Sequence, residues 1–192
     1  IELDPKYARA IANLGWTYAR DQQDGWSLSP EKSLDIASRL INKAVQIDGS
    51  SFHVQWVLGQ ILLFKKEYEA ALQAVKRAIE LSPSNPDPKI LVARILAFAG
   101  NAKESIELIE AAIKNNPFYP MQYMMNLGIA HFVNGDYDKA EEALLKAIER
   151  NPDAQRVRMW LVATYSNSGK LDDAVWQYEE LITLNPSFSL AS

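Results

Sequence analysis

Residues 126–152 read NLGIAHFVNGDYDKAEEALLKAIERNP, and this stretch holds one full copy of a pattern that recurs along the chain. A Leu-Gly pair at 127–128 is followed by Asn134-Gly135-Asp136, whose residue types mark a turn. Ala140 comes next, and Asn151-Pro152 ends the unit because the residue before a proline is disfavoured in a helix. The pattern predicts two helices joined by a tight turn.

The same features return at nearly constant spacing. Small residues are separated by 34, 34, 35 and 34 positions in the series Ala37, Ala71, Ser105, Ala140 and Ala174. A second series follows seven residues behind: Ala44, Ala78, Ala112, Ala147 and Leu181. A turn former closes each unit: Pro5, Gly49, Pro83, Pro117, Pro152 and Pro186. Three series in one register predict a repeated helix hairpin, with Gly59 against Ala71 and Gly128 against Ala140 as helix contacts.

A period of about 34 residues, with Leu-Gly pairs at 14–15, 58–59 and 127–128, resembles the tetratricopeptide repeat (TPR) family. The resemblance covers the whole chain and implies an all-α, right-handed superhelical solenoid of about five helix hairpins. Residues 1–192 would form a single array in which 1–7 end a truncated preceding repeat. The repeats are expected at about 8–51, 52–85, 86–120, 121–154 and 155–188.

The turn and proline positions set the expected helix bounds. Ten helices are predicted at about 6–20, 30–47, 52–65, 68–81, 86–99, 102–115, 120–134, 137–150, 154–168 and 171–184. Ser29-Pro30-Glu31 predicts that the second helix begins there, since Ser favours the N-cap and Pro the first helical position.

The first unit is ten residues longer than the others, and the excess lies around residues 21–30. This segment carries Trp26, which is expected either to fold back on the helices or to meet a partner. Together with Asn13 to Asp21 and the Tyr119-Pro120 connector, the long unit is similar to the C-terminal TPR arrays of bacterial class III adenylate or guanylate cyclases and related winged-helix regulators. That resemblance implies a regulatory or interaction role without catalytic activity.

Composition narrows the function classes. The net charge of −4 argues against nucleic-acid binding, which requires clustered Lys and Arg. The nearest basic cluster, Arg150, Arg156 and Arg158, is interpreted as a solvated rim. With 0 cysteines, disulfides, thiolate metal sites and cysteine nucleophiles are excluded. The apolar runs are too short to insert in a membrane, and the start at Ile1 suggests a fragment of a longer protein.

An enzyme is not expected. His53 and His131 are the only histidines, and neither has a partner at metal-ligand spacing, so no metal, cofactor or catalytic residue is predicted. His131 is interpreted as a packing residue. Paired carboxylates such as Glu141-Glu142 point to different sides of a helix and are interpreted as solvated.

The resemblance places a peptide-binding groove on the first helix of each hairpin. Counting units from Ala8, Phe52, Pro86, Met121 and Gln155, the family's groove positions are places 2, 5, 6, 9, 12 and 13. The predicted groove residues at these places are Arg9, Asn13, Trp16, Trp56, Gln60, Phe64, Arg94, Phe98, Met125, Asn126, Ile129, Phe132 and Met159. Of these, Trp16, Trp56, Phe98, Met125 and Phe132 are expected to be exposed. The family's carboxylate clamp is absent, because Ala12, Trp16 and Val57 hold its places.

Asn13 and Asn126 share place 6, where two interpretations remain open: a hydrogen bond to a ligand backbone, or one within the array. The predicted function is a non-catalytic protein-interaction scaffold that binds a protein or peptide partner through an apolar groove, in a larger bacterial signalling protein. The alternative is a self-assembly module that forms a homo-oligomer through Val175, Trp176, Leu181 and Ile182. The compartment is not determined by the sequence, although the cytoplasm is favoured.

Overall fold

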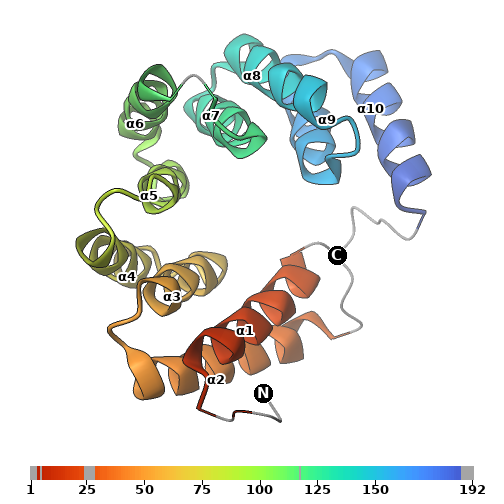
Figure 1. Ribbon diagram of the computed structural model, residues 1–192. Helices are drawn as coiled ribbons and strands as arrows, with labels where there is room; N and C mark the ends of the chain where they lie inside the picture. Colours follow the sequence, from red (N-terminus) through yellow and green to blue (C-terminus); the bar gives the residue numbers. More distant parts are fainter. Residues whose placement is uncertain (1–3, 5, 24–28, 117, 187–192) are drawn as a thin grey trace. The chain divides into compact units, whose positions relative to one another are not determined.

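The computed structural model describes residues 4, 6–23, 29–116 and 118–186 and is all-α over that part of the chain. Ten helices occur in these ranges, and no strand is present among the described residues (Figure 1). They are α1 (Ala8–Gln23), α2 (Pro30–Asp48), α3 (Phe52–Phe64), α4 (Tyr68–Leu81), α5 (Asp87–Phe98), α6 (Ala102–Asn115), α7 (Met121–Asn134), α8 (Tyr137–Arg150), α9 (Gln155–Ser168) and α10 (Leu171–Leu184). The predicted hairpin architecture is confirmed, and the predicted helix bounds agree with the structure except at the end of α1, which runs to Gln23 instead of residue 20. Trp26 lies outside the described residues.

The turns inside the hairpins explain why the bounds could be read from the sequence. Gly100, Gly135 and Gly169 each follow a first helix and have positive φ angles of 91°, 84° and 79°. Glycine adopts this left-handed conformation without a Cβ clash, and it ends the helix. In the second hairpin the same position is held by Lys66 with φ 61°, so a lysine there takes the conformation that glycine takes elsewhere.

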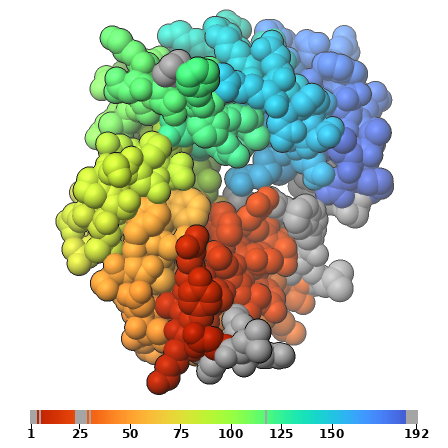
Figure 2. Space-filling model, in the orientation of Figure 1, coloured from red at the N-terminus to blue at the C-terminus, as the bar shows by residue number. Residues whose placement is uncertain are grey.

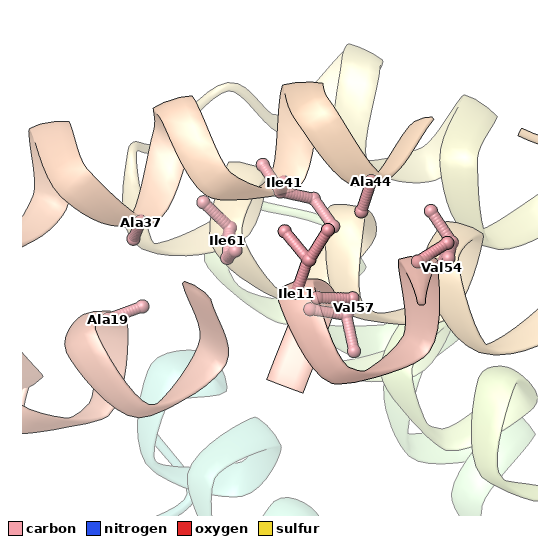
Figure 3. Packing of buried hydrophobic residues seen from close by; sticks show 10 residues of the cluster. Ile11, Ala19, Ala37, Ile41, Ala44, Val54, Val57 and Ile61 are labelled. Atoms are coloured by element: carbon pink, nitrogen blue, oxygen red, sulfur yellow. The ribbon is translucent and has the colours of Figure 1, made fainter. Parts of the chain in front are cut away.

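The chain divides into two compact units, residues 1–95 and 96–192. In the first unit, α1, α2 and α3 enclose one apolar core. Figure 3 shows Ile11, Ile41 and Val57, one from each of these helices, meeting in that core. A second core joins α3 and α4 to the part of α5 in this unit, through residues such as Val75 and Leu91.

Glycine at place 8 lets the two helices of a hairpin approach closely, as predicted. A Cβ on Gly59 would lie 3.4 Å from the carbonyl oxygen of Ala71, and a Cβ on Gly128 would lie 3.2 Å from that of Ala140. The same Cβ on Gly128 would also lie 2.6 Å from Cγ of Leu144, closer than real side chains approach. The small residues are therefore helix contacts.

In the second unit an apolar core joins α7, α8 and α9, with Leu144, Val157 and Leu161 fully buried. The hydroxyl of Tyr165 on α9 donates to Oε1 of Glu141 on α8 over 3.3 Å. Burial, and then the neighbouring Glu141, raise the pKa of Tyr165 to about 12, so the hydroxyl keeps its proton.

The interpretation of Arg158 as a solvated residue is wrong. Its side chain is only 8% exposed and joins α9 to α10. Nη1 donates to Oε1 of Gln177 over 2.9 Å, and Nη2 donates to the carbonyl of Pro152 over 3.0 Å. Glu180 lies 3.4 Å from Nη2. Arg150 is exposed, but its guanidinium stacks 4.2 Å from the ring centroid of Tyr119, so it too has a structural contact.

Candidate functional site

The thirteen predicted groove residues all lie on the first helices of the hairpins. Their burial differs widely. The exposed ones are Arg9, Asn13 and Phe98. The half-buried ones are Trp16, Trp56, Phe64, Phe132 and Met159. The buried ones are Gln60, Arg94, Met125, Asn126 and Ile129.

Two of the apolar residues belong to the core of the second unit. Met125 is 5% exposed and Ile129 is 1% exposed, and both pack in the cluster that joins α7, α8 and α9. The expectation that Met125 is exposed is therefore wrong. Met125 lies on the side of α7 that the neighbouring first helix, α9, covers. A place number in the repeat does not show how much of a side chain the neighbouring helix buries.

In the first unit, aromatic rings from α1 and α3 form one cluster, which we call the N-terminal aromatic cluster: Trp16, His53, Trp56 and Phe64. Trp16 stacks on Phe64 with ring centroids 5.3 Å apart, and it meets Trp56 at 6.5 Å. His53 lies 5.9 Å from Trp56. The guanidinium of Arg94 on α5 lies 5.6 Å from the Phe64 ring centroid, a cation–π distance.

The edge of this cluster carries polar side chains. Nε2 of His53 lies 2.7 Å from Oδ1 of Asn13, a hydrogen bond between α3 and α1. Burial, and then the charge of Arg9, lower the pKa of His53, so the neutral ring is favoured. For Asn13 the structure shows the hydrogen bond within the array. Asn126 makes one as well, since Nδ2 donates to the carbonyl of Gln122 over 2.7 Å.

Two polar atoms of the N-terminal aromatic cluster and its neighbour on α3 are buried without a hydrogen-bond partner among the described residues. They are Nε1 of Trp56, a donor, and Oε1 of Gln60, an acceptor. The two residues are four positions apart, so they lie on the same side of α3. Buried polar groups are normally paired, and an unpaired one costs about 1–3 kcal/mol. The pair therefore marks a place where a ligand with a donor and an acceptor would gain free energy.

The second unit has its own group of rings, which we call the C-terminal aromatic cluster: Phe98, Phe132, Tyr137 and Trp160. Trp160 on α9 lies 6.1 Å from Phe98 and 5.4 Å from Phe132. Phe132 also meets Tyr137 at 5.7 Å. Trp160 was not among the predicted groove residues, although it holds place 6, the same place as Asn13 and Asn126. Reading place 6 in every unit would have found it.

The four residues predicted to mediate self-association differ in their exposure to solvent. On α10, Val175 is 56% exposed and Trp176 is 55% exposed, while Ile182 is half-buried. Leu181 is fully buried, so its inclusion in a contact surface is wrong. It packs with Ala174 and Gln177 on the α9 side of the helix, because these positions recur every three or four residues.

The described residues contain no group of three or more His, Asp or Glu side chains that could hold a metal ion. His131 is 5% exposed, and its Nδ1 lies 3.6 Å from Oδ2 of Asp136 at the turn before α8. Burial is the main cause that lowers the pKa of His131. No helix in the described ranges is long and apolar enough to cross a membrane.

Comparison with known families agrees with the geometry of the hairpins. A tetratricopeptide repeat model matches residues 92–154 and 125–187, and a second tetratricopeptide repeat model matches residues 52–85. The chain belongs to the tetratricopeptide repeat family. The close glycine–alanine contacts at places 8 and 20 are thus contacts between the two helices of TPR hairpins.

Solved structures resemble the chain along most of its length. The chain is 20% identical to TTC0263, a TPR protein of Thermus thermophilus, with a TM-score of 0.72 over 90% of this chain and 92% of that one. It is 19% identical to PilW, a type IV pilus biogenesis factor, with a TM-score of 0.68 over 93% and 80% of the two chains. YrrB, described as a TPR protein with an unusual peptide-binding site, is 18% identical with a TM-score of 0.54 over 88% and 86%.

These likenesses show the TPR fold alone. No curated protein matches the chain. The resemblance to the arrays of cyclases and winged-helix regulators gains no support from the matched family models or from these three structures, so it stays a prediction.

Proposed function

We propose that this TPR protein is a non-catalytic interaction module that binds a peptide segment of a partner protein at the N-terminal aromatic cluster. The observation that carries the proposal is the pair of buried, unpartnered polar atoms on α3, Nε1 of Trp56 and Oε1 of Gln60. An extended peptide presents the N–H donor and the C=O acceptor of one residue on the same side. It therefore supplies both missing partners.

The surroundings favour a peptide with a bulky apolar anchor. Trp16 and Phe64 are half-buried and stacked on each other. An apolar side chain of the peptide can pack against these rings, and the rings lose little conformational entropy because they are already held in place. Aromatic residues of this kind dominate the binding energy of many interfaces. Both polar atoms are covered by neighbouring side chains, so binding requires at least one side chain to change its rotamer, which is common at interfaces.

A role as the interaction region of a larger bacterial signalling protein is part of the proposal and rests on the sequence resemblance alone. The proposal predicts affinity for peptides and no catalytic turnover. Peptides that bind are to be selected from a random library displayed on phage, with the folded chain 1–192 as the target.

Trp56→Phe tests the role of the indole N–H. Phenylalanine keeps most of the packing against the two cores of the first unit and deletes only the donor, whereas alanine would remove core contacts as well. We expect the variant to bind selected peptides about five-fold more weakly, since a net hydrogen bond contributes about 1 kcal/mol. Isothermal titration calorimetry measures the change.

The matched control is Trp176→Phe on α10, which changes an exposed indole outside the cluster and should leave the affinity unaltered. Thermal unfolding of Trp56→Phe should stay close to that of the parent protein, because the deleted donor has no partner among the described residues. Equal affinities for Trp56→Phe and the parent protein would show that the indole N–H takes no part in binding.

A further inference from the structure

In the first four hairpins, the second helix has one face that is covered by the next hairpin. We call this the stacking face and define it by four positions on each helix. They are Leu34, Ser38, Ile41 and Val45 on α2; Tyr68, Leu72, Val75 and Ile79 on α4; Ala102, Ile106, Ile109 and Ile113 on α6; Tyr137, Glu141, Leu144 and Ile148 on α8. None of these sixteen residues is exposed, and the third of each set is fully or almost fully buried.

The same positions on α10 are Leu171, Val175, Tyr178 and Ile182, and they are not covered to the same degree. Leu171 is 64% exposed and Val175 is 56% exposed. Tyr178 is half-buried, where Ile41, Val75, Ile109 and Leu144 are at most 1% exposed. The stacking face of α10 is therefore apolar and incompletely covered among the described residues.

In the second to fifth hairpins, the first helix has the complementary face, at places 3, 7 and 10, on the side of the preceding hairpin. At place 10, Ile61, Ile95, Ala130 and Thr164 are at most 1% exposed, whereas Thr17 on α1 is exposed. At place 7, Leu14 is 37% exposed, whereas Leu58, Val92, Leu127 and Leu161 are half-buried or buried. Places 3, 7 and 10 of α1 therefore correspond to the surface that packs against a stacking face in the other hairpins.

The helices α10 and α1 also carry opposite net charges. The segment Leu171–Leu184 contains four acidic residues, Asp172, Asp173, Glu179 and Glu180, and no Lys or Arg. The α1 helix carries two basic residues, Arg9 and Arg20, and one acidic residue, Asp21, so its net charge is +1 against −4 for the α10 helix. Opposite charges beside matching apolar stripes favour contact between α10 and α1 and disfavour contact between two copies of α10.

We propose that the stacking face of α10 binds the place 3, 7 and 10 stripe of α1 from a second copy of this chain, so that TPR units continue from one molecule to the next. This goes beyond the proposed peptide binding and uses neither aromatic cluster. The contact is head-to-tail: each molecule contributes α10 to one neighbour and α1 to another. Such an interface generates a ring if it closes and a chain if it does not.

Figure 2 shows atoms of both α1 (red) and α10 (blue) at the surface of their respective units. Trp176 is the natural comparison residue. Its equivalents Arg39, Gln73, Glu107 and Glu142 are all exposed, so this position lies on the outer side of the second helix, away from the stacking face. A substitution at Trp176 therefore changes exposed apolar area on α10 without touching the proposed contact.

Sedimentation velocity on chain 1–192 tests the proposal with two charge-introducing variants. Val175→Glu disables the α10 face and Leu14→Glu disables the α1 face. The parent protein should show a mass that rises with concentration up to about 100 µM, the range in which weak specific contacts form. Each variant alone should sediment as a monomer, and Trp176→Glu should behave like the parent protein.

The decisive sample is an equimolar mixture of Val175→Glu and Leu14→Glu. One intact α10 face and one intact α1 face remain between the two variants, so they should form a dimer of twice the monomer mass and nothing larger. Leu171→Lys and Thr17→Glu replace either variant that fails to show the parent circular dichroism spectrum, since both residues are exposed.

A strictly monomeric parent protein would overturn the proposal and leave the faces to a different protein or to a further hairpin of a longer chain. The proposal would also be overturned if the parent protein associates but the mixture of Val175→Glu and Leu14→Glu stays monomeric. Loss of association in the Trp176→Glu variant would overturn it as well. Peptide binding by the two variants should stay at the parent level, so failure here is distinguishable from failure of the proposed function.

Discussion

Gly128→Ala is expected to lower the free energy of unfolding by about 1–3 kcal/mol, the cost of inserting atoms in a well-packed core. The added Cβ would lie 2.6 Å from Cγ and 2.8 Å from Cδ2 of Leu144, and 3.2 Å from the carbonyl oxygen of Ala140. Leu144 is fully buried and touches α9 residues, so it has little room to move. Alanine's higher helix propensity, worth about 1 kcal/mol, offsets part of this cost.

Urea unfolding followed by far-UV circular dichroism measures the change. Gly15→Ala is the matched control, because the nearest atoms to its added Cβ are 3.2 and 3.3 Å away and the adjacent core can adjust by a few tenths of an ångström. We expect a smaller loss in the control. A Gly128→Ala variant as stable as the parent protein would mean that α7 and α8 are not in the close contact described.

Arg158→Met is expected to destabilise the second unit by about 1–3 kcal/mol, the cost of leaving a buried polar group unpaired. Methionine fills much of the space of the arginine stem but cannot donate to Oε1 of Gln177, whose side chain is only 1% exposed. The carbonyl of Pro152 loses its Nη2 donor as well. The contact with Glu180 adds little, because the Glu180 side chain is 44% exposed and the ion pair is screened by water.

The double variant Arg158→Met with Gln177→Met separates the cost of an unpaired amide from that of lost packing. Replacing both members of a buried polar pair by apolar side chains is often neutral or stabilising, so much of the lost stability should return. Thermal unfolding of the parent protein, both single variants and the double variant gives the coupling. Strictly additive losses would show that the Arg158–Gln177 hydrogen bond does not join α9 to α10 as described.

Most of the fold could be predicted because the repeat encodes local signals. Gly135 and Gly169 mark the turns inside hairpins, and Pro152 marks the break between units, so α3 to α10 begin and end within about two residues of the predicted bounds. The end of α1 was less accurate: it runs to Gln23 instead of residue 20. The long first unit lacks the glycine turn that fixes the other hairpins.

The candidate site was harder to predict, since a place number gives the direction of a side chain but not the size of its neighbours. Met125 and Phe132 both belong to the predicted groove, yet Met125 is buried and Phe132 is half-buried beside Trp160. Arg158 was interpreted as solvated because its partner Gln177 lies on another helix. Contacts across helices of this kind depend on three-dimensional packing that the one-dimensional repeat does not record.

The most direct test of peptide binding at the N-terminal aromatic cluster follows the indole N–H signals of the five tryptophans in a nitrogen–proton correlation spectrum. A selected peptide should shift the Trp56 signal strongly, because Nε1 has no hydrogen-bond partner among the described residues and gains an acceptor on binding. The Trp16 signal should also shift, because its ring contacts that of Trp56. Trp176 should stay in place. A saturating peptide that moves Trp176 and leaves Trp16 and Trp56 unchanged would contradict the account.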